Sequence, residues 1–132
     1  IEDAENEEIS PNAPTLIVSK LASSLVNKTQ KLKIFTGTIV HQAYGQDETT
    51  EQYICNYGLN PKFRDTIEKG QFKIAGVDFR GEARVVEISD HPFYVGALYL
   101  PQISSAPGSP HPLIVAYLRA VLSIRTSDSR KL

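Results

Sequence analysis

A nearly apolar, strand-like stretch runs from His91 to Gln102, with the sequence HPFYVGALYLPQ, and ends at the turn that Pro101 marks. A buried strand that leads into a loop often presents a working side chain at its end, so we predict the site at Leu100 and Gln102. Leucine has no ionisable group, and glutamine carries an amide in place of a carboxylate. The stretch therefore predicts a fold more clearly than an acid or base reaction.

The single cysteine and the three histidines are the other residues able to do nucleophilic or acid–base chemistry. Cys55 lies in a segment predicted to be extended, without the small residues of a sharp nucleophile turn, so we interpret its thiol as structural. His91 and His111 lie beside prolines, where an imidazole makes local hydrogen bonds. His41 has only two acidic residues in the following turn as companions, so we predict no metal site.

Composition bounds the class of protein. The 132 residues are 41% hydrophobic, enough for the core of a single domain. Fourteen basic and fifteen acidic residues leave a formal charge of -1, so neither nucleic acid nor an anionic membrane is an expected partner. No apolar run approaches the roughly 20 residues of a membrane helix. The lone cysteine excludes an internal disulfide and suits the cytoplasm, and because position 1 is not methionine we expect part of a longer polypeptide.

The pattern of apolar and turn-forming residues predicts several short strands and two helices. Asn60 and Pro61 suit the start of a helix over 62–69, because asparagine caps free N–H groups and proline fits the first helical position. The stretch 93–99 is apolar nearly throughout, which predicts a central strand buried on both faces. The other strands are expected at 16–18, 32–34, 36–40 after a joint at Gly37, 52–59 with Tyr53, Cys55 and Tyr57 on one face, 71–79 and 83–88, with a turn at 46–51.

These elements predict one partial domain over 1–125. It begins with an acidic loop at 1–10, has a loop at 104–112 and a closing helix at 113–124, and is followed by a polar tail at 126–132. Basic residues near the C-terminus are interpreted as the solvated end of that helix rather than as a phosphate site: Arg119, Arg125, Arg130 and Lys131.

Several short motifs, in order and at compatible spacing, resemble the second half of the glutamine amidotransferase domain of CTP synthases. Ala43-Tyr44-Gly45 resembles the family's AYG turn, and the stretch 51–61, EQYICNYGLNP, resembles its ERHRHRYEVNP pattern. Three further stretches are similar to the family's DHPWF, FHPE and HPLF: DHPF at 90–93, YLPQ at 99–102 and PHPL at 110–113. The resemblance implies an α/β, three-layer, flavodoxin-like class I amidotransferase fold with a central mixed sheet, here only its second half.

The resemblance also implies a reaction and the residues it would need. In the family a cysteine attacks the glutamine amide, a histidine activates the cysteine, and a glutamate orients the histidine, so that ammonia passes to a synthetase domain. The histidine and glutamate positions of FHPE are Leu100 and Gln102 here. A substrate-contacting arginine of the family aligns with Asn56, whereas Glu8 is in register with a glutamate that meets the substrate amide.

These departures predict a catalytically inactive amidotransferase-like domain with a structural, assembly or regulatory role, without cofactor. One alternative is the attached domain of a CTP synthase, which makes CTP from UTP and ATP with ammonia or glutamine. Another is a different hydrolase on the same scaffold, with an upstream nucleophile. The expected partners are the upstream part of the same polypeptide or a companion chain, and a homo-oligomer.

Overall fold

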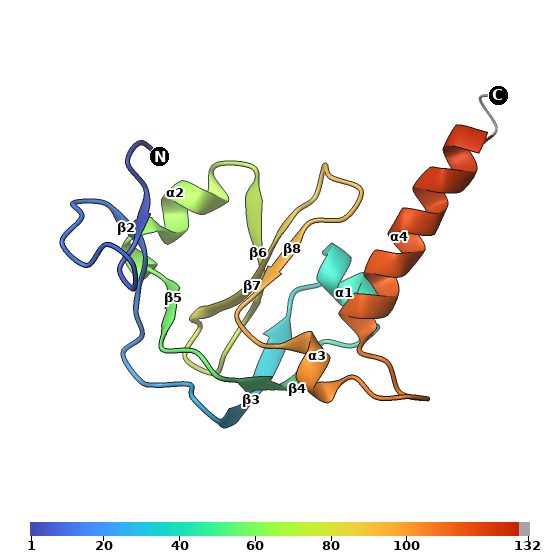
Figure 1. Ribbon diagram of the computed structural model, residues 1–132, viewed down its shortest axis with the longest axis horizontal. Helices are drawn as coiled ribbons and strands as arrows, with labels where there is room; N and C mark the ends of the chain where they lie inside the picture. The colour runs from blue at the N-terminus through green and yellow to red at the C-terminus, as the bar shows by residue number, and fades with distance from the viewer. Residues whose placement is uncertain (130–132) are drawn as a thin grey trace.

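The computed structural model describes residues 1–129 as an α/β fold with two sheets (Figure 1). The smaller sheet has the order β1-β2-β5, where β1 is parallel to β2 and β2 is antiparallel to β5. The larger sheet has the order β4-β3-β6-β7-β8, and every neighbouring pair in it is antiparallel. The strands are β1 (Glu5–Asn6), β2 (Leu16–Lys20), β3 (Lys28–Ile34), β4 (Glu48–Tyr53), β5 (Tyr57–Leu59), β6 (Phe72–Val77), β7 (Ala83–Ile88) and β8 (Val95–Ala97).

The helices of residues 1–129 are short, apart from the last one. They are α1 (Ile39–Tyr44), the 3-10 turn η1 (Pro61–Phe63), α2 (Arg64–Glu68), α3 (Pro101–Ser104) and α4 (Pro112–Ser129). The first turns of α4 pack beside α1 and α3, and the rest of α4 continues beyond the larger sheet (Figure 1). The core lies between the larger sheet, α1 and the start of α4, and its buried members are Leu25, Leu32, Ile34, Val40, Tyr53, Ala75, Val85, Tyr99 and Leu113.

Several predicted elements are confirmed. The strand predicted at 83–88 is β7, and the strands predicted at 16–18 and 71–79 are β2 and β6. The Asn60 side chain caps η1 by accepting a hydrogen bond from the Lys62 N–H, as its residue type predicted. The helix predicted at 113–124 is α4, which begins one residue earlier and continues to Ser129. The first part of the predicted polar tail is therefore helical, and residues 130–132 lie outside the described residues.

The extended segment predicted at 36–40 is wrong, because the chain turns there and enters α1. The Thr38 side chain accepts a hydrogen bond from the His41 N–H, and so caps the helix. Gly45 ends α1 in the left-handed conformation, at φ 66°, which glycine adopts without strain. The β-branched Ile39 and Val40 favoured a strand by propensity, and this local cap overrides them.

The turn predicted at 46–51 and the strand predicted at 52–59 are also wrong. β4 already begins at Glu48 and pairs with β3 up to Tyr53. The chain then leaves the larger sheet and pairs with β2 as β5, so Tyr53, Cys55 and Tyr57 do not share one strand. Alternation of apolar residues continued across the break, and the sequence pattern therefore concealed the change of sheet.

The expectation of a long central strand over 93–99 is wrong for the described residues. β8 covers only Val95–Ala97 and lies at the edge of the larger sheet, because no strand within residues 1–129 pairs with its other side. The expected central mixed sheet is likewise not observed here: the larger sheet is antiparallel, and the parallel pairing that is described joins β1 and β2.

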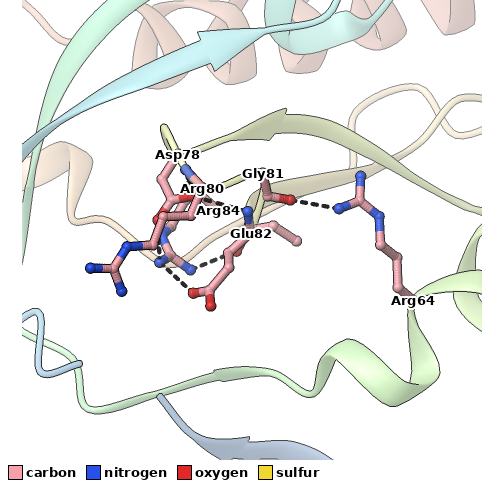
Figure 2. A network of polar contacts seen from close by, with 7 residues as sticks. Arg64, Asp78, Arg80, Gly81, Glu82 and Arg84 are labelled. Carbon is pink, nitrogen blue, oxygen red and sulfur yellow. Dashed lines mark hydrogen bonds and ion pairs between the residues drawn. The ribbon is translucent and has the colours of Figure 1, made fainter. Parts of the chain in front are cut away.

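The turn between β6 and β7 is fixed by a polar network (Figure 2). One Asp78 oxygen accepts hydrogen bonds from the N–H groups of Arg80 and Glu82, at 2.9 Å each, and the other accepts one from the Arg84 guanidinium at 2.8 Å. The Arg84 and Asp78 side chains are 4% and 2% exposed. Arg64 of α2 donates to the Gly81 carbonyl at 2.6 Å and so ties α2 to this turn.

Candidate functional site

Leu100 and Gln102 lie at the start of α3 rather than at the end of a strand. β8 ends at Ala97, and Leu100 is the residue that precedes the helix. Its N–H donates to the Gln52 carbonyl at 3.2 Å, which fixes the entry to α3 against β4. The two residues face one cavity of about 380 Å³, whose other lining residues are Phe93, Val95, Ala97, Tyr99, Pro101, Leu113, Ile114 and Tyr117.

The wall of this cavity holds no group suited to acid–base catalysis at neutral pH. Among the described residues that line it there is no imidazole, thiol or carboxylate. Its polar side chains are one amide, that of Gln102, and two phenols. The arrangement suits the binding of an apolar group better than the transfer of a proton.

A buried polar network lies behind the cavity and joins three distant parts of the chain. Oε1 of Glu51 in β4 is 3.0 Å from Nε2 of His111, and both side chains are 3% exposed. The Tyr44 hydroxyl, at the end of α1, donates to the same Glu51 oxygen and lies 3.2 Å from the Tyr99 hydroxyl and from His111 Nε2. We call Tyr44, Glu51, Tyr99 and His111 the buried network.

Hydrogen bonding assigns His111 a structural role. Its Nδ1 accepts a hydrogen bond from the Leu113 N–H at 3.2 Å, so the ring proton lies on Nε2 and is donated toward Glu51. Both ring nitrogens are engaged and the ring is buried, which leaves no lone pair for a substrate. Local hydrogen bonding at His111 was predicted from its prolines; the pairing with Glu51 was missed, because 60 positions separate the two residues and no sequence pattern links them.

Three tyrosines of this region have raised pKa values. Burial, which disfavours the phenolate, is the main cause for Tyr44, Tyr53 and Tyr99. The pKa of Tyr44 is raised further by the neighbouring Tyr99 and by its hydrogen bond to Glu51. These phenols therefore stay protonated in the folded chain at pH values where they ionise in the unfolded chain.

We expect the free energy of unfolding to fall as the pH rises above about 10, the value at which tyrosine ionises in the unfolded chain. Above it the unfolded state binds fewer protons than the folded state, so each such tyrosine lowers stability by about 1.4 kcal/mol per pH unit. Urea unfolding at pH 8 to 11 measures the slope. Tyr44→Phe should make it shallower, whereas the same substitution at exposed Tyr94 should not; equal slopes would contradict the assignment.

The structure does not gather the other predicted site residues at the cavity. Glu8 is exposed in the turn after β1, and its N–H is held by the Asn6 side chain at 2.9 Å. Asn56 is exposed between β4 and β5. Cys55 is half-buried, and its thiol donates to the Leu98 carbonyl at 3.4 Å. None of the three lines the cavity of Leu100 and Gln102.

The remaining histidines and cations make local contacts. Nε2 of His41 lies 2.8 Å from an Asp47 carboxylate oxygen, within hydrogen-bond distance, and the His91 ring accepts a hydrogen bond from the Phe93 N–H. Across residues 1–129, no three His, Cys, Asp or Glu side chains are placed to hold a metal ion. Arg119 and Arg125 are exposed on α4, while the other two predicted basic residues fall among 130–132. No helix in the described part of the chain is long and apolar enough to cross a membrane.

A second, larger cavity of about 590 Å³ lies between the two sheets. It is lined by apolar residues of β2, β5, β7 and β8, with α2 beside it, and Arg84 and Tyr57 are among its few polar members. Nothing in the sequence pattern indicated it, because its walls come from strands of both sheets.

Comparison with models of protein families finds no match. Two curated relatives are the CTP synthases of Methanothermobacter thermautotrophicus, 33% identical over 134 residues, and Sulfurisphaera tokodaii, 27% identical over 133 residues. These alignments cover 92% and 94% of this chain but 25% of each relative, so the chain spans about a quarter of the length of these relatives.

A solved structure described as Trypanosoma brucei CTPS, glutaminase domain with bound acivicin, has the same fold, with a TM-score of 0.85 at 18% identity. The match covers 92% of this chain and 51% of that chain. Sequence and fold thus agree on one relationship, and they agree with the order of motifs along the chain. Over most of its length, this chain is homologous to the glutaminase domain of CTP synthase.

Proposed function

We propose that the chain is the second half of a class I glutamine amidotransferase-like domain that does not hydrolyse glutamine and that serves folding, assembly or regulation. The observation that carries this proposal is the pair Leu100 and Gln102, which by the resemblance to FHPE stand at the family's catalytic histidine and glutamate, and which line a cavity without an imidazole, thiol or carboxylate. Amide hydrolysis by this route needs a thiolate, an adjacent base and a group that orients the base. Leucine accepts no proton, and glutamine lacks the charge that favours an imidazolium.

No neighbouring residue is placed to substitute for them. His111 is buried, and both of its ring nitrogens are engaged, Nε2 by Glu51 and Nδ1 by the Leu113 N–H. Cys55 lies outside the cavity and donates its thiol proton to a backbone carbonyl. The same contacts disfavour the alternative of a different hydrolase whose general base comes from the described residues.

The fold proposed for the complete domain is the three-layer, flavodoxin-like arrangement with a central mixed sheet. In this proposal the larger sheet, which is antiparallel, belongs to one part of that arrangement, and the preceding half of the domain contributes parallel strands. The partner is then the upstream part of the same polypeptide, in the cytoplasm. The coverage of 51% of the solved glutaminase domain supports this division.

The test is ammonia release from glutamine by the polypeptide that includes the natural sequence ahead of Ile1. We expect a rate at least about 10⁴-fold below that of the Trypanosoma brucei glutaminase domain assayed in parallel, since loss of a triad member costs on the order of 10⁴ to 10⁶. A turnover of about 1 s⁻¹ or faster, as in ordinary enzymes, would show that the domain is active.

The second candidate function is that of a domain attached to a working CTP synthase. It is favoured by the relatives, which are CTP synthases over a length about four times that of this chain. It requires CTP to form from UTP, ATP and free ammonia, with no product when glutamine replaces ammonia. If no CTP forms with ammonia and none forms with glutamine, this candidate function is wrong.

A further inference from the structure

The two most exposed large apolar side chains of residues 1–129 are Ile9 and Phe79, at 78% and 73%. A single exposed apolar side chain is ordinary on a protein surface, so the charges around each one decide what it means. Ile9 follows a segment with five carboxylates at positions 2–8, and the first basic residue of the chain is Lys20. Phe79 instead lies among cations. The two side chains therefore have opposite electrostatic surroundings.

Ile9 is displayed on an ordered turn, residues 5–10, which we call the acidic turn. The Asn6 carbonyl accepts a hydrogen bond from the Ile9 N–H at 3.1 Å, and the Asn6 side chain accepts one from the Glu8 N–H at 2.9 Å. The Glu7 carboxylate accepts from the backbone N–H at the end of β2, which ties the turn to that strand. Glu8 and Ile9 are both exposed. The turn thus presents an apolar side chain next to a free carboxylate.

Phe79 lines a surface hollow of about 320 Å³, which we call the basic hollow. Lys31 and Lys33 of β3 and Glu48 of β4 also line it. The two lysines are two positions apart in a strand, so their side chains leave the same face of the sheet. The Arg80 guanidinium lies over the Phe79 ring, 5.3 Å from the ring centre. The exposed charged side chains at the hollow are therefore three cations and one carboxylate.

The cations of the basic hollow are available to a partner. Lys31 lies 3.9 Å from Glu48, and both side chains are largely exposed, so this pair contributes little to stability. Within residues 1–129, Lys33 and Arg80 form no ion pair. The other carboxylate of the wall, that of Asp78, is 2% exposed and is paired inside its own turn. An anionic group that enters the hollow would meet positive charge that no neighbour neutralises.

The turn that carries Phe79 is as firmly held as the acidic turn. The buried Asp78 carboxylate fixes the N–H groups of Arg80 and Glu82, and Gly81 adopts the left-handed conformation at φ 81°. Both surfaces are therefore formed before any contact between them. Preformed surfaces bind at a lower entropic cost than segments that must first become ordered.

The basic hollow fits an acidic segment that carries an exposed apolar side chain, and the acidic turn has this chemistry. Within residues 1–129, no hydrogen bond or ion pair joins the two surfaces of one chain. A second copy of the chain can bring them together. Each copy carries both surfaces, so the contact forms twice in a two-fold dimer, or repeats from head to tail in a larger assembly.

We propose that the acidic turn of one copy of this chain docks in the basic hollow of a second copy, with Ile9 packed against Phe79 and Glu8 facing Lys33. Exposed ion pairs add little affinity, so the apolar contact stabilises the complex, whereas the charges select the orientation and speed association. This contact gives the proposed assembly role a partner. It does not depend on whether the domain hydrolyses glutamine.

The first test is sedimentation equilibrium of the polypeptide that includes the natural sequence ahead of Ile1, at concentrations up to about 1 mM. We expect a concentration-dependent complex of two or more copies. Its dissociation constant should rise at least about tenfold between about 50 and 500 mM NaCl, because salt screens exposed charges. A polypeptide that stays monomeric at every concentration would overturn the proposal. Protection of Phe79 from hydroxyl-radical labelling in that monomer would show that another part of the polypeptide covers the hollow.

The second test exchanges the charges across the contact. Lys33→Glu and Glu8→Lys should each raise the dissociation constant at least about tenfold, because like charges would then face each other. The two substitutions in one chain restore opposite charges and should return the dissociation constant most of the way. Lys28→Glu is the matched control, since it changes an exposed lysine of β3 that does not line the hollow, and about threefold or less is expected. Equal effects at Lys28 and Lys33, or no recovery in the double variant, would contradict the contact.

The third test addresses the apolar part of the contact. Ile9→Ser should raise the dissociation constant at least about tenfold, whereas Ile54→Ser, at a side chain that is 50% exposed and outside both surfaces, should leave it unchanged. An unchanged Tm shows that each variant is folded. Equal effects of the two substitutions would exclude Ile9 from the contact and overturn the proposal. These measurements use no glutamine, so a failed contact leaves the expected inactivity standing, and an active domain leaves the contact standing.

Discussion

The double substitution Leu100→His and Gln102→Glu is expected to speed ammonia release from glutamine by about 10² to 10⁴-fold, in a polypeptide whose preceding sequence supplies a cysteine on a strand-to-helix turn. That range is the usual contribution of a positioned general base. Both positions line one cavity at the start of α3, so the new imidazole and carboxylate would face the same space. The imidazole would restore the proton acceptor, and the carboxylate would orient it.

The single substitutions separate these two contributions. Leu100→His alone should give a smaller gain than the pair, and Gln102→Glu alone should give none, because a carboxylate without the imidazole has nothing to orient. The measurement is initial ammonia release at saturating glutamine, with the unchanged polypeptide as reference. No gain from the double variant would mean that other substrate contacts are lost as well, as Asn56 at the position of the family's arginine suggests.

Glu51→Ala is expected to lower the free energy of unfolding by about 3 kcal/mol, measured by urea denaturation at pH 7. Removing the carboxylate leaves the Tyr44 hydroxyl and the His111 Nε2–H buried without their acceptor, and each such loss costs about 1–3 kcal/mol. The other Glu51 oxygen is buried and accepts no hydrogen bond from the described residues, which destabilises the folded state. Removing this oxygen therefore offsets part of the loss of stability.

The matched control lies on the same strand. Glu48 pairs with Lys31 at 3.9 Å, and the two side chains are 63% and 79% exposed, so Glu48→Ala should change stability by about 0.5 kcal/mol or less. Glu51→Gln keeps an acceptor for Tyr44 and should cost less than Glu51→Ala. A cost below about 1 kcal/mol for Glu51→Ala would contradict the role given to the buried network.

The elements that could be predicted from the sequence are those with local signals. The Asn60 side chain caps η1 through a residue only two positions away, and Pro61 fits the first position of that turn. β7 lies between the turn signals Arg80-Gly81 and Ser89-Asp90. α1 was missed because a six-residue helix that begins with Ile39 and Val40 has strand-like propensity, and its cap at Thr38 was not recognised.

The site could be predicted only in part. The positions of Leu100 and Gln102 follow from motif order, and the structure brings both to one cavity. The buried network escaped prediction because Glu51 appeared as one more polar residue of a turn, and its partner is 60 positions away. The position of β8 in the sheet could not be predicted from the sequence either. The apolar composition of β8 indicated a buried strand, but composition does not determine which strands lie beside it.

The span of the buried network also bears on the order in which the molecule assembles. Tyr44 and His111 are 67 positions apart, so their contact closes a long loop, whereas the hairpin of β6 and β7 closes a turn of a few residues. Closing a long loop lowers the conformational entropy of the chain before the contact that closes it can stabilise the fold. Contacts between residues far apart in the sequence therefore form late in folding. We therefore expect Glu51→Ala to accelerate unfolding while leaving the folding rate nearly unchanged in stopped-flow measurements. The buried network would then slow the unfolding of the native structure without being part of the folding nucleus.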